Sequence, residues 1–183
     1  MKILIAYYSR TGNNKFIAKK LSASLNADLY EIIPRLNVFF FLILSSLLKI
    51  SFGNKKTKHR IETYDKIILC GPIWMGQLIS PLFDFIKKNK NTIKALYFAT
   101  CCGGGESEKD SPFGYNGVFK KVKMLLNDSF IAGEAFSIDA IIPDELKGKT
   151  DEIMKLKLSE ETFNNSTLLK KYDNFIQIVK KES

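Results

Sequence analysis

The sequence predicts an α/β domain built on a doubly wound parallel β-sheet of five strands, with helices on both faces. Three observations lead to this fold class. Short apolar runs alternate with amphipathic stretches, five of those runs have the length of a strand, and no linker rich in proline, glycine or serine divides the 183 residues. A chain of this length makes one domain of ordinary size, so we expect residues 1–183 to fold as a single domain.

The five expected strands are near-continuous apolar runs, as is typical of parallel strands that are covered on both faces. Proline closes the second run and a Gly-Pro pair closes the third, which marks where those strands end. In chain order we place the strands at residues 3–8, 29–33, 67–70, 95–100 and 131–138.

Amphipathic helices are expected where apolar residues recur at helical spacing. We place them around residues 16–25, 82–86, 118–126 and 168–179. Ligands of doubly wound sheets bind at the carboxyl ends of the strands, near the topological switch point. The loops after strands one, three and four should therefore carry the function.

Two segments go beyond this minimal plan. Residues 36–60 hold an inserted apolar helix followed by a basic loop, and residues 143–165 form a polar stretch with additional helices. Twelve of the 17 residues in 36–52 are Leu, Ile, Val or Phe, but a membrane span needs about 20 apolar residues. Because Phe39, Phe40 and Phe41 are consecutive, one ring must point away from any single core face.

We therefore expect residues 36–52 to form an amphipathic helix that is partly exposed and lies near the ligand-binding loops. The basic run 55–60 follows it, so the helix suits a homodimer contact, an anionic membrane surface or an apolar acceptor such as a quinone. A helix buried in the core is the alternative.

Charge and composition exclude several classes of protein. The chain has 28 Lys and Arg against 19 Asp and Glu, a net charge of +9, which predicts attraction to an anion. The basic residues are spread over polar helix faces without a nucleic-acid motif, so no nucleic-acid binding is expected. A hydrophobic fraction of 45% excludes a disordered chain. Three cysteines and an N-terminus without a signal-peptide pattern predict a cytoplasmic protein, with peripheral membrane contact as a further option.

The loop after strand one places hydroxyl and amide side chains and a glycine at the start of a helix. Backbone N–H groups and the helix dipole favour an anion there, and Ser9 and Thr11 can each donate a hydrogen bond to a phosphate oxygen. The loop lacks the Gly-Lys-Ser/Thr ending of a Walker motif and the glycines of a dinucleotide fingerprint. Ordinary helix capping by Thr11 or Asn13 is the alternative.

The loop after strand three holds the only tryptophan of the chain, Trp74, between Pro72 and Gly76. Its ring can stack on a planar ligand, and Gly76 lets the backbone approach a ring closely. A core tryptophan that plugs the end of the sheet is the alternative. Three glycines follow strand four, where exposed amides can line the polar edge of a ligand; a flexible connection would need the same residues.

Together the three loops resemble those of the flavodoxin-like family. The segments YYSRTGNNKFIAKKL, ILCGPIWMGQLISPLFDFI and YFATCCGGG carry the resemblance, in the order and spacing of the family, over about residues 1–130. The resemblance implies the strand order 2-1-3-4-5 and bound FMN. It also implies three groups of cofactor-binding residues: Ser9, Arg10, Thr11, Gly12, Asn13 and Asn14 at the phosphate; Pro72, Ile73, Trp74, Met75 and Gly76 at the isoalloxazine; and Thr100, Cys101, Cys102, Gly103, Gly104 and Gly105 at the pyrimidine edge, with Tyr115 as a further stacking candidate.

The expected function is electron transport through bound FMN, with a redox protein or a small molecule such as a quinone as partner. A flavin-dependent oxidoreductase of the NAD(P)H:quinone type and a binding module without redox activity are the alternatives. The best-known carriers of the family are acidic, whereas this chain is basic. We expect no catalytic acid or base and no metal site, because His59 is the only histidine and Cys101 and Cys102 are adjacent, which is poor spacing for zinc.

Overall fold

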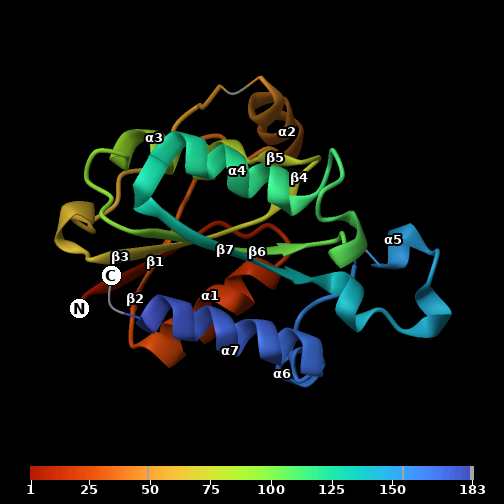
Figure 1. Ribbon diagram of the computed structural model, residues 1–183. Coiled ribbons are helices and arrows are strands. Elements are labelled where there is room, and N and C mark those ends of the chain that lie inside the picture. Colours follow the sequence, from red (N-terminus) through yellow and green to blue (C-terminus); the bar gives the residue numbers. More distant parts are fainter. Residues whose placement is uncertain (49, 154, 182–183) are drawn as a thin grey trace.

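The computed structural model describes residues 1–48, 50–153 and 155–181 and contains the predicted five-stranded parallel sheet (Figure 1). Its strands lie in the order β2-β1-β3-β6-β7, which is the predicted order 2-1-3-4-5. All residues of the interior strands β1 and β3 are buried, as expected of parallel strands that are covered on both faces. The strands are β1 (Ile3–Tyr7), β2 (Asp28–Glu31), β3 (Lys66–Cys70), β6 (Leu96–Cys102) and β7 (Phe130–Ser137).

Helices cover both faces of the sheet and divide the core into two clusters. On one face lie α1 (Asn13–Leu25), α6 (Glu160–Phe163) and α7 (Ser166–Lys180). On the other lie α2 (Phe39–Leu47), α3 (Ser80–Asn89) and α4 (Tyr115–Leu126), as Figure 1 shows. Side chains alternate along the strands, so Ile5 packs toward α1 and Leu4 toward the opposite layer.

The two ends of the inserted segment lie side by side and are joined by backbone hydrogen bonds. The Arg35 N–H donates to Gly53 and the Lys55 N–H donates to Ile33, which closes residues 36–52 into a loop. Helix α2 occupies nine residues of this loop, and Lys49 lies outside the described residues. The predicted apolar helix is therefore present and shorter than the apolar stretch that encodes it.

The polar stretch 143–165 contains short helical elements, as expected. A 3-10 helix at Asp144–Leu146 precedes α5 (Thr150–Ile153) and α6, and Met154 lies outside the described residues. Helix α6 begins with a capping box in which Ser159 and Thr162 satisfy each other's backbone N–H groups. None of the helices in the described ranges is long and apolar enough to cross a lipid bilayer.

The sequence did not predict a small antiparallel hairpin made of β4 (Ile73–Trp74) and β5 (Gln77–Leu78). Its two turn residues, Met75 and Gly76, both have positive φ angles of 51° and 65°, as a type I′ turn requires. The Gly76 Cα faces the Pro112 carbonyl, and a Cβ would collide with it. This glycine therefore serves both the turn and a close backbone contact.

Candidate functional site

The three predicted loops meet at the carboxyl edge of β1, β3 and β6. The pairing of Tyr7 with Cys70, and of Cys70 with Ala99, brings these strand ends level with one another. A hollow of about 180 Å³ lies between the loops. It is lined by Thr11, Asn13, Asn14, Pro72, Ile73, Trp74, Cys101, Cys102, Gly103, Ile138, Ile153 and Leu156.

The first loop presents the uncapped N-terminus of α1 to this hollow. Gly12 is the residue before the helix, with φ 103°, and no side chain caps the first turn, which also lacks an acidic residue. Ser9 Oγ accepts a hydrogen bond from the Gly12 N–H over 3.2 Å, and Thr11 is exposed. First-turn N–H groups at the positive end of a helix dipole bind anions, so this loop suits a phosphate.

The two asparagines of this loop hold neighbouring backbone instead of pointing freely into the hollow. Asn14 Oδ1 accepts from the Cys101 N–H at 2.8 Å, and Asn14 Nδ2 donates to the Cys101 carbonyl at 3.4 Å. Asn13 likewise bonds the Leu158 N–H and the Leu156 carbonyl. Asn14 thus joins the first loop to the third, and Asn13 joins it to the C-terminal segment.

Arg10 turns away from the phosphate loop and toward the insertion. Its guanidinium carbon lies 4.2 Å from the centre of the Phe39 ring, a cation–π contact. Tyr8 supports the same junction, because its Oη is 3.0 Å from Asn37 Oδ1. Insertion 36–52 is therefore attached directly beside the first loop, as the sequence predicted.

Trp74 is half-buried in the β4–β5 hairpin and lines the hollow. Its ring meets Phe39 edge-on, with centroids 5.2 Å apart, and Tyr8 edge-on at 6.4 Å. The indole also packs against the cluster of core residues beneath α3 and α4. Trp74 therefore has one side against the core and another at the hollow, and its stacking on a planar ligand stays a prediction.

The third loop continues from the end of β6. Thr100 is fully buried, and its Oγ1 has no hydrogen-bond partner among the described residues. Gly103 is exposed with open space around its Cα, whereas Gly105 packs so closely on the Asp139 carboxylate that a Cβ would collide. The glycines thus shape this loop for two different reasons, open amides at the start and tight packing at the end.

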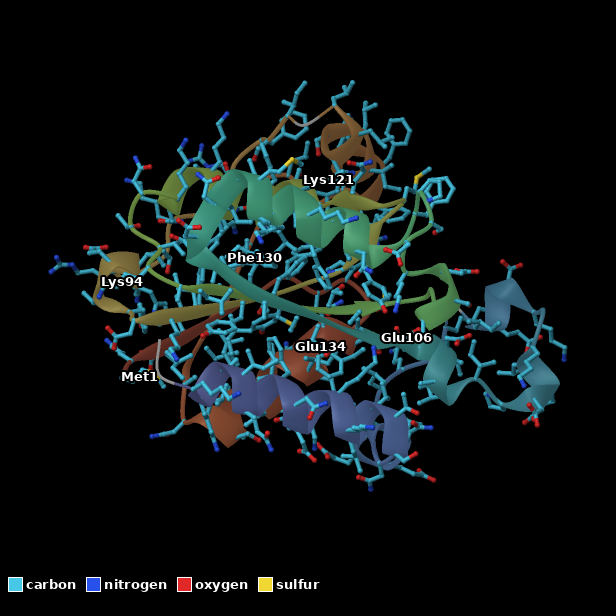
Figure 2. The ribbon with its side chains drawn as sticks, in the orientation of Figure 1. Met1, Lys94, Glu106, Lys121, Phe130 and Glu134 are labelled. Atoms are coloured by element: carbon cyan, nitrogen blue, oxygen red, sulfur yellow. The ribbon has the colours of Figure 1, made fainter. Side chains whose placement is uncertain are left out.

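A second hollow of about 150 Å³ adjoins the first and shares Ile73, Cys102 and Gly103 with it. Tyr115, at the start of α4, lines this second hollow. Burial, and then the Glu106 carboxylate, raise the pKa of Tyr115 well above its usual value. Lys171 pairs with both Glu106 and Glu134, which Figure 2 labels, and lies 5.8 Å from the Tyr115 ring centre.

The cysteines at the site are held as thiols. Burial raises the pKa of Cys102 to about 12 and moves those of Cys101 and Cys70 above their usual values. Thiols react as thiolates, so at neutral pH these side chains behave as small apolar groups. Among the described residues, no group of three or more His, Cys, Asp or Glu side chains is placed to hold a metal ion.

The site also contains residues that the sequence did not reveal. Ile138, Ile153 and Leu156 line the first hollow from the C-terminal side. Ile153 and Leu156 belong to a short group of apolar residues, with Met154 and Leu158, inside an otherwise polar stretch. This pattern indicates that some of these side chains are buried, but it does not show what they pack against. An apolar groove of about 270 Å³ lies elsewhere, between α2, α3 and α4, and contains none of the predicted site residues.

Comparison with known proteins agrees with this architecture. A family described as a flavodoxin domain matches residues 46–129, which include the second and third loops. No curated protein matches the chain. The chain has a flavodoxin-like fold, as the resemblance of the three loop segments implied.

Several solved structures share this fold, and three of them illustrate the similarity to this chain. A candidate flavoprotein from Bacteroides eggerthii is 24% identical, with a TM-score of 0.62 over 84% of this chain and 98% of that one. A flavoprotein in complex with FMN from Lactobacillus acidophilus is 19% identical, with a TM-score of 0.59 over 73% and 91% of the two chains. An NADPH-quinone reductase from P. pentosaceus is 11% identical, with a TM-score of 0.54 over the full length of both.

Proposed function

We propose that this protein binds FMN in the hollow between its three loops and transfers electrons through it. The observation that carries the proposal is the convergence of an uncapped helix N-terminus, a half-buried tryptophan and a glycine-rich loop on one hollow at the switch point of the sheet. When bound, FMN supplies the redox chemistry, and the protein supplies binding, orientation and electrostatics.

The residues present fit such a cofactor. Thr11, Ser9 and the first N–H groups of α1 would hold the phosphate, because they are hydrogen-bond donors at the positive end of a helix dipole. Trp74 and Ile73 would form an apolar wall beside the ring system. The backbone of loop 100–105 would meet its polar edge, where the Thr100 hydroxyl lacks a partner in the part of the chain described. An apolar wall disfavours extra negative charge on a reduced ring.

Binding is tested by titrating the ligand-free protein with FMN, riboflavin and FAD. We expect FMN to bind tightest and to quench the emission of Trp74, the only tryptophan. Thr11→Ala should weaken FMN binding about tenfold, the loss of one hydrogen bond to a charged group, and leave riboflavin binding unchanged. Riboflavin that binds as tightly as FMN would overturn the phosphate assignment, and a protein that ignores all three flavins would favour a binding module.

A second candidate function is reduction of quinone-like acceptors with a nicotinamide donor. The observation that favours it is an exposed apolar rim beside the site, where Met75 and Phe113 are 55% and 68% exposed. The backbone of Phe113 packs against Gly76, so the two side chains belong to one edge. The solved NADPH-quinone reductase has the same fold. Steady consumption of NADPH on adding a quinone would support the enzyme, and its absence would support the carrier.

A further inference from the structure

Helix α2 buries Leu42 in the core but, unlike an ordinary surface helix, exposes most of its other large apolar side chains. Its two serines are buried, whereas its phenylalanines face outward. Ser46 Oγ accepts the Ser80 N–H at 2.8 Å, and Ser45 Oγ lies 2.9 Å from Ser80 Oγ. These bonds attach the polar side of α2 to the first residue of α3, so the packing leaves the apolar side without a partner in the described chain.

We define the apolar face as Phe40, Phe41, Leu44, Leu47, Leu48 and Ile50, all of which are exposed. Phe40 is 67% exposed, and its ring contacts that of Phe41 with centroids 5.9 Å apart. Surface helices normally place such residues inward. A contiguous exposed patch of this kind marks an interaction site.

The apolar face continues onto α4 across the apolar groove. This groove is lined by Ile50 from the insertion and by Met124 and Leu125 from α4. Met124 is 72% exposed. Figure 1 shows α2 and α4 on the same side of the sheet, and Figure 2 places Lys121 on that side of the molecule. The surface is therefore formed by two helices and is not a single protruding loop.

Cations and no acids flank the apolar face in the sequence. Residues 32–61 contain no Asp or Glu and contain Arg35, Lys49, Lys55, Lys56, Lys58 and Arg60. Helix α4 adds three lysines and no acid. Lys55, Lys56 and Lys58 are exposed and form no ion pair with the described residues.

We propose that the apolar face docks on an anionic membrane surface, with α2 lying in the plane of the interface. Exposed phenylalanine and leucine side chains beside lysines are the composition of helices that insert into the headgroup region. Charge decides between lipid and a second copy of the chain, because a second copy would bring the same cations together whereas acidic lipids neutralise them. This inference does not rest on the proposed FMN-binding function.

The test is sedimentation of the full chain with vesicles of phosphatidylglycerol and phosphatidylcholine, and with vesicles of phosphatidylcholine alone. We expect binding to the acidic vesicles only, which weakens as salt is added. Phe40→Ser with Leu44→Ser should reduce binding at least tenfold. Ile131→Ser with Ile178→Ser is the matched control, since those residues are exposed on β7 and α7, away from α2.

Charge variants separate the electrostatic contribution to vesicle binding from the apolar contribution. Lys55→Gln and Lys56→Gln should each weaken binding to acidic vesicles about fivefold, because a lysine near such a surface contributes about 1 kcal/mol. Lys15→Gln and Lys19→Gln, which remove exposed lysines from α1 on the opposite layer, should have little effect. Equal effects in the two pairs would show general attraction of a basic protein, and would contradict the proposal.

A fluorescence variant keeps the apolar face intact if the serine variants fail to fold. Phe40→Trp in a Trp74→Phe background should show blue-shifted emission on acidic vesicles. Emission that stays unchanged, or a wild-type chain that ignores acidic vesicles, overturns the proposal. So does a concentration-dependent dimer that Phe40→Ser dissociates and that binds no vesicles, which would assign the face to a second copy.

Discussion

At the scale of single residues, Asn14 shows how the site is held together. It occupies the second position of α1, and both ends of its amide bond the backbone of Cys101 across the sheet edge. The resemblance to flavodoxin-like loops places this side chain at the phosphate, which stays a prediction. In the structure its amide satisfies two backbone groups of Cys101 and so fixes the distance between the two loops.

We expect Asn14→Ala to destabilise the ligand-free protein by about 2 kcal/mol, because the Cys101 N–H loses its partner while remaining buried. The midpoint of urea unfolding measures this. Thr11→Ala is the control: Thr11 is exposed and makes no hydrogen bond through its side chain among the described residues, so stability should change by less than about 0.5 kcal/mol. Equal stability of Asn14→Ala and wild type would return Asn14 to the role of a phosphate donor.

The residues that could be placed at the hollow or its turn from the sequence were those with a local signal. Gly76 and Trp74 are examples, because a glycine after a strand and a lone tryptophan in a loop are visible in the sequence. The orientation of Arg10 could not be predicted, since it depends on the Phe39 ring supplied by a distant segment. Ile153 and Leu156 were missed for the same reason: long-range packing, not local pattern, brings them to the hollow.

At the scale of elements, the side chain of Lys66 joins the sheet to the end of the last helix through hydrogen bonds. It lies at the start of β3 and is buried, and its Nζ donates to the Val179 and Lys181 carbonyls at 2.9 and 2.6 Å. A cation at the C-terminus of α7 interacts favourably with the negative end of the helix dipole. The final helix depends on this contact as well as on its apolar face.

Replacing Lys66 with Met should therefore cost about 2 kcal/mol, the value of hydrogen bonds to a charged group. For a chain of this size that lowers the melting temperature by about 4–8 °C. Lys94→Met is the matched control, because Lys94, labelled in Figure 2, forms only an exposed ion pair with Asp65. Scanning calorimetry compares the two, and a similar small shift in both would show that Lys66 contributes no more than a surface charge.

Strands and helices could be predicted from the sequence where the apolar pattern was long, and they were missed where the element was short. All five strands of the sheet were found, although β6 runs two residues past its expected end and β2 ends two residues early. The β4–β5 hairpin was missed because its strands have two residues each, and because Met75 gave no sign of a positive φ. The exposed face of α2 was predictable, since three consecutive phenylalanines cannot share one side of a helix.

At the scale of the whole molecule, the pKa values of several buried tyrosine and cysteine side chains are all raised. Burial, the largest cause in each case, raises the pKa values of Tyr7, Tyr64 and Cys102 to about 12. In an unfolded chain tyrosine titrates near 10 and cysteine near 8.5. The folded state therefore keeps protons that the unfolded state releases as the pH rises.

This difference predicts loss of stability at alkaline pH. The free energy of unfolding should be constant with respect to these groups below about pH 8.5 and should fall as the pH rises from there toward 12. Urea unfolding at pH 8, 9.5 and 11 measures the slope. Tyr7→Phe should make the slope shallower, because it removes one of the titrating groups, and a midpoint that does not move up to pH 11 would contradict the prediction.

The edge-on contact between Phe39 and Trp74 links the inserted helix to the loop that lines the hollow. Two binding events that share such a contact obey thermodynamic reciprocity. If docking of α2 changes the affinity of the hollow for its ligand by some factor, the bound ligand must change the affinity of docking by the same factor. The fraction of chains with a ligand in the hollow and the fraction bound at a surface would then change together, because one pair of aromatic rings joins the two sites.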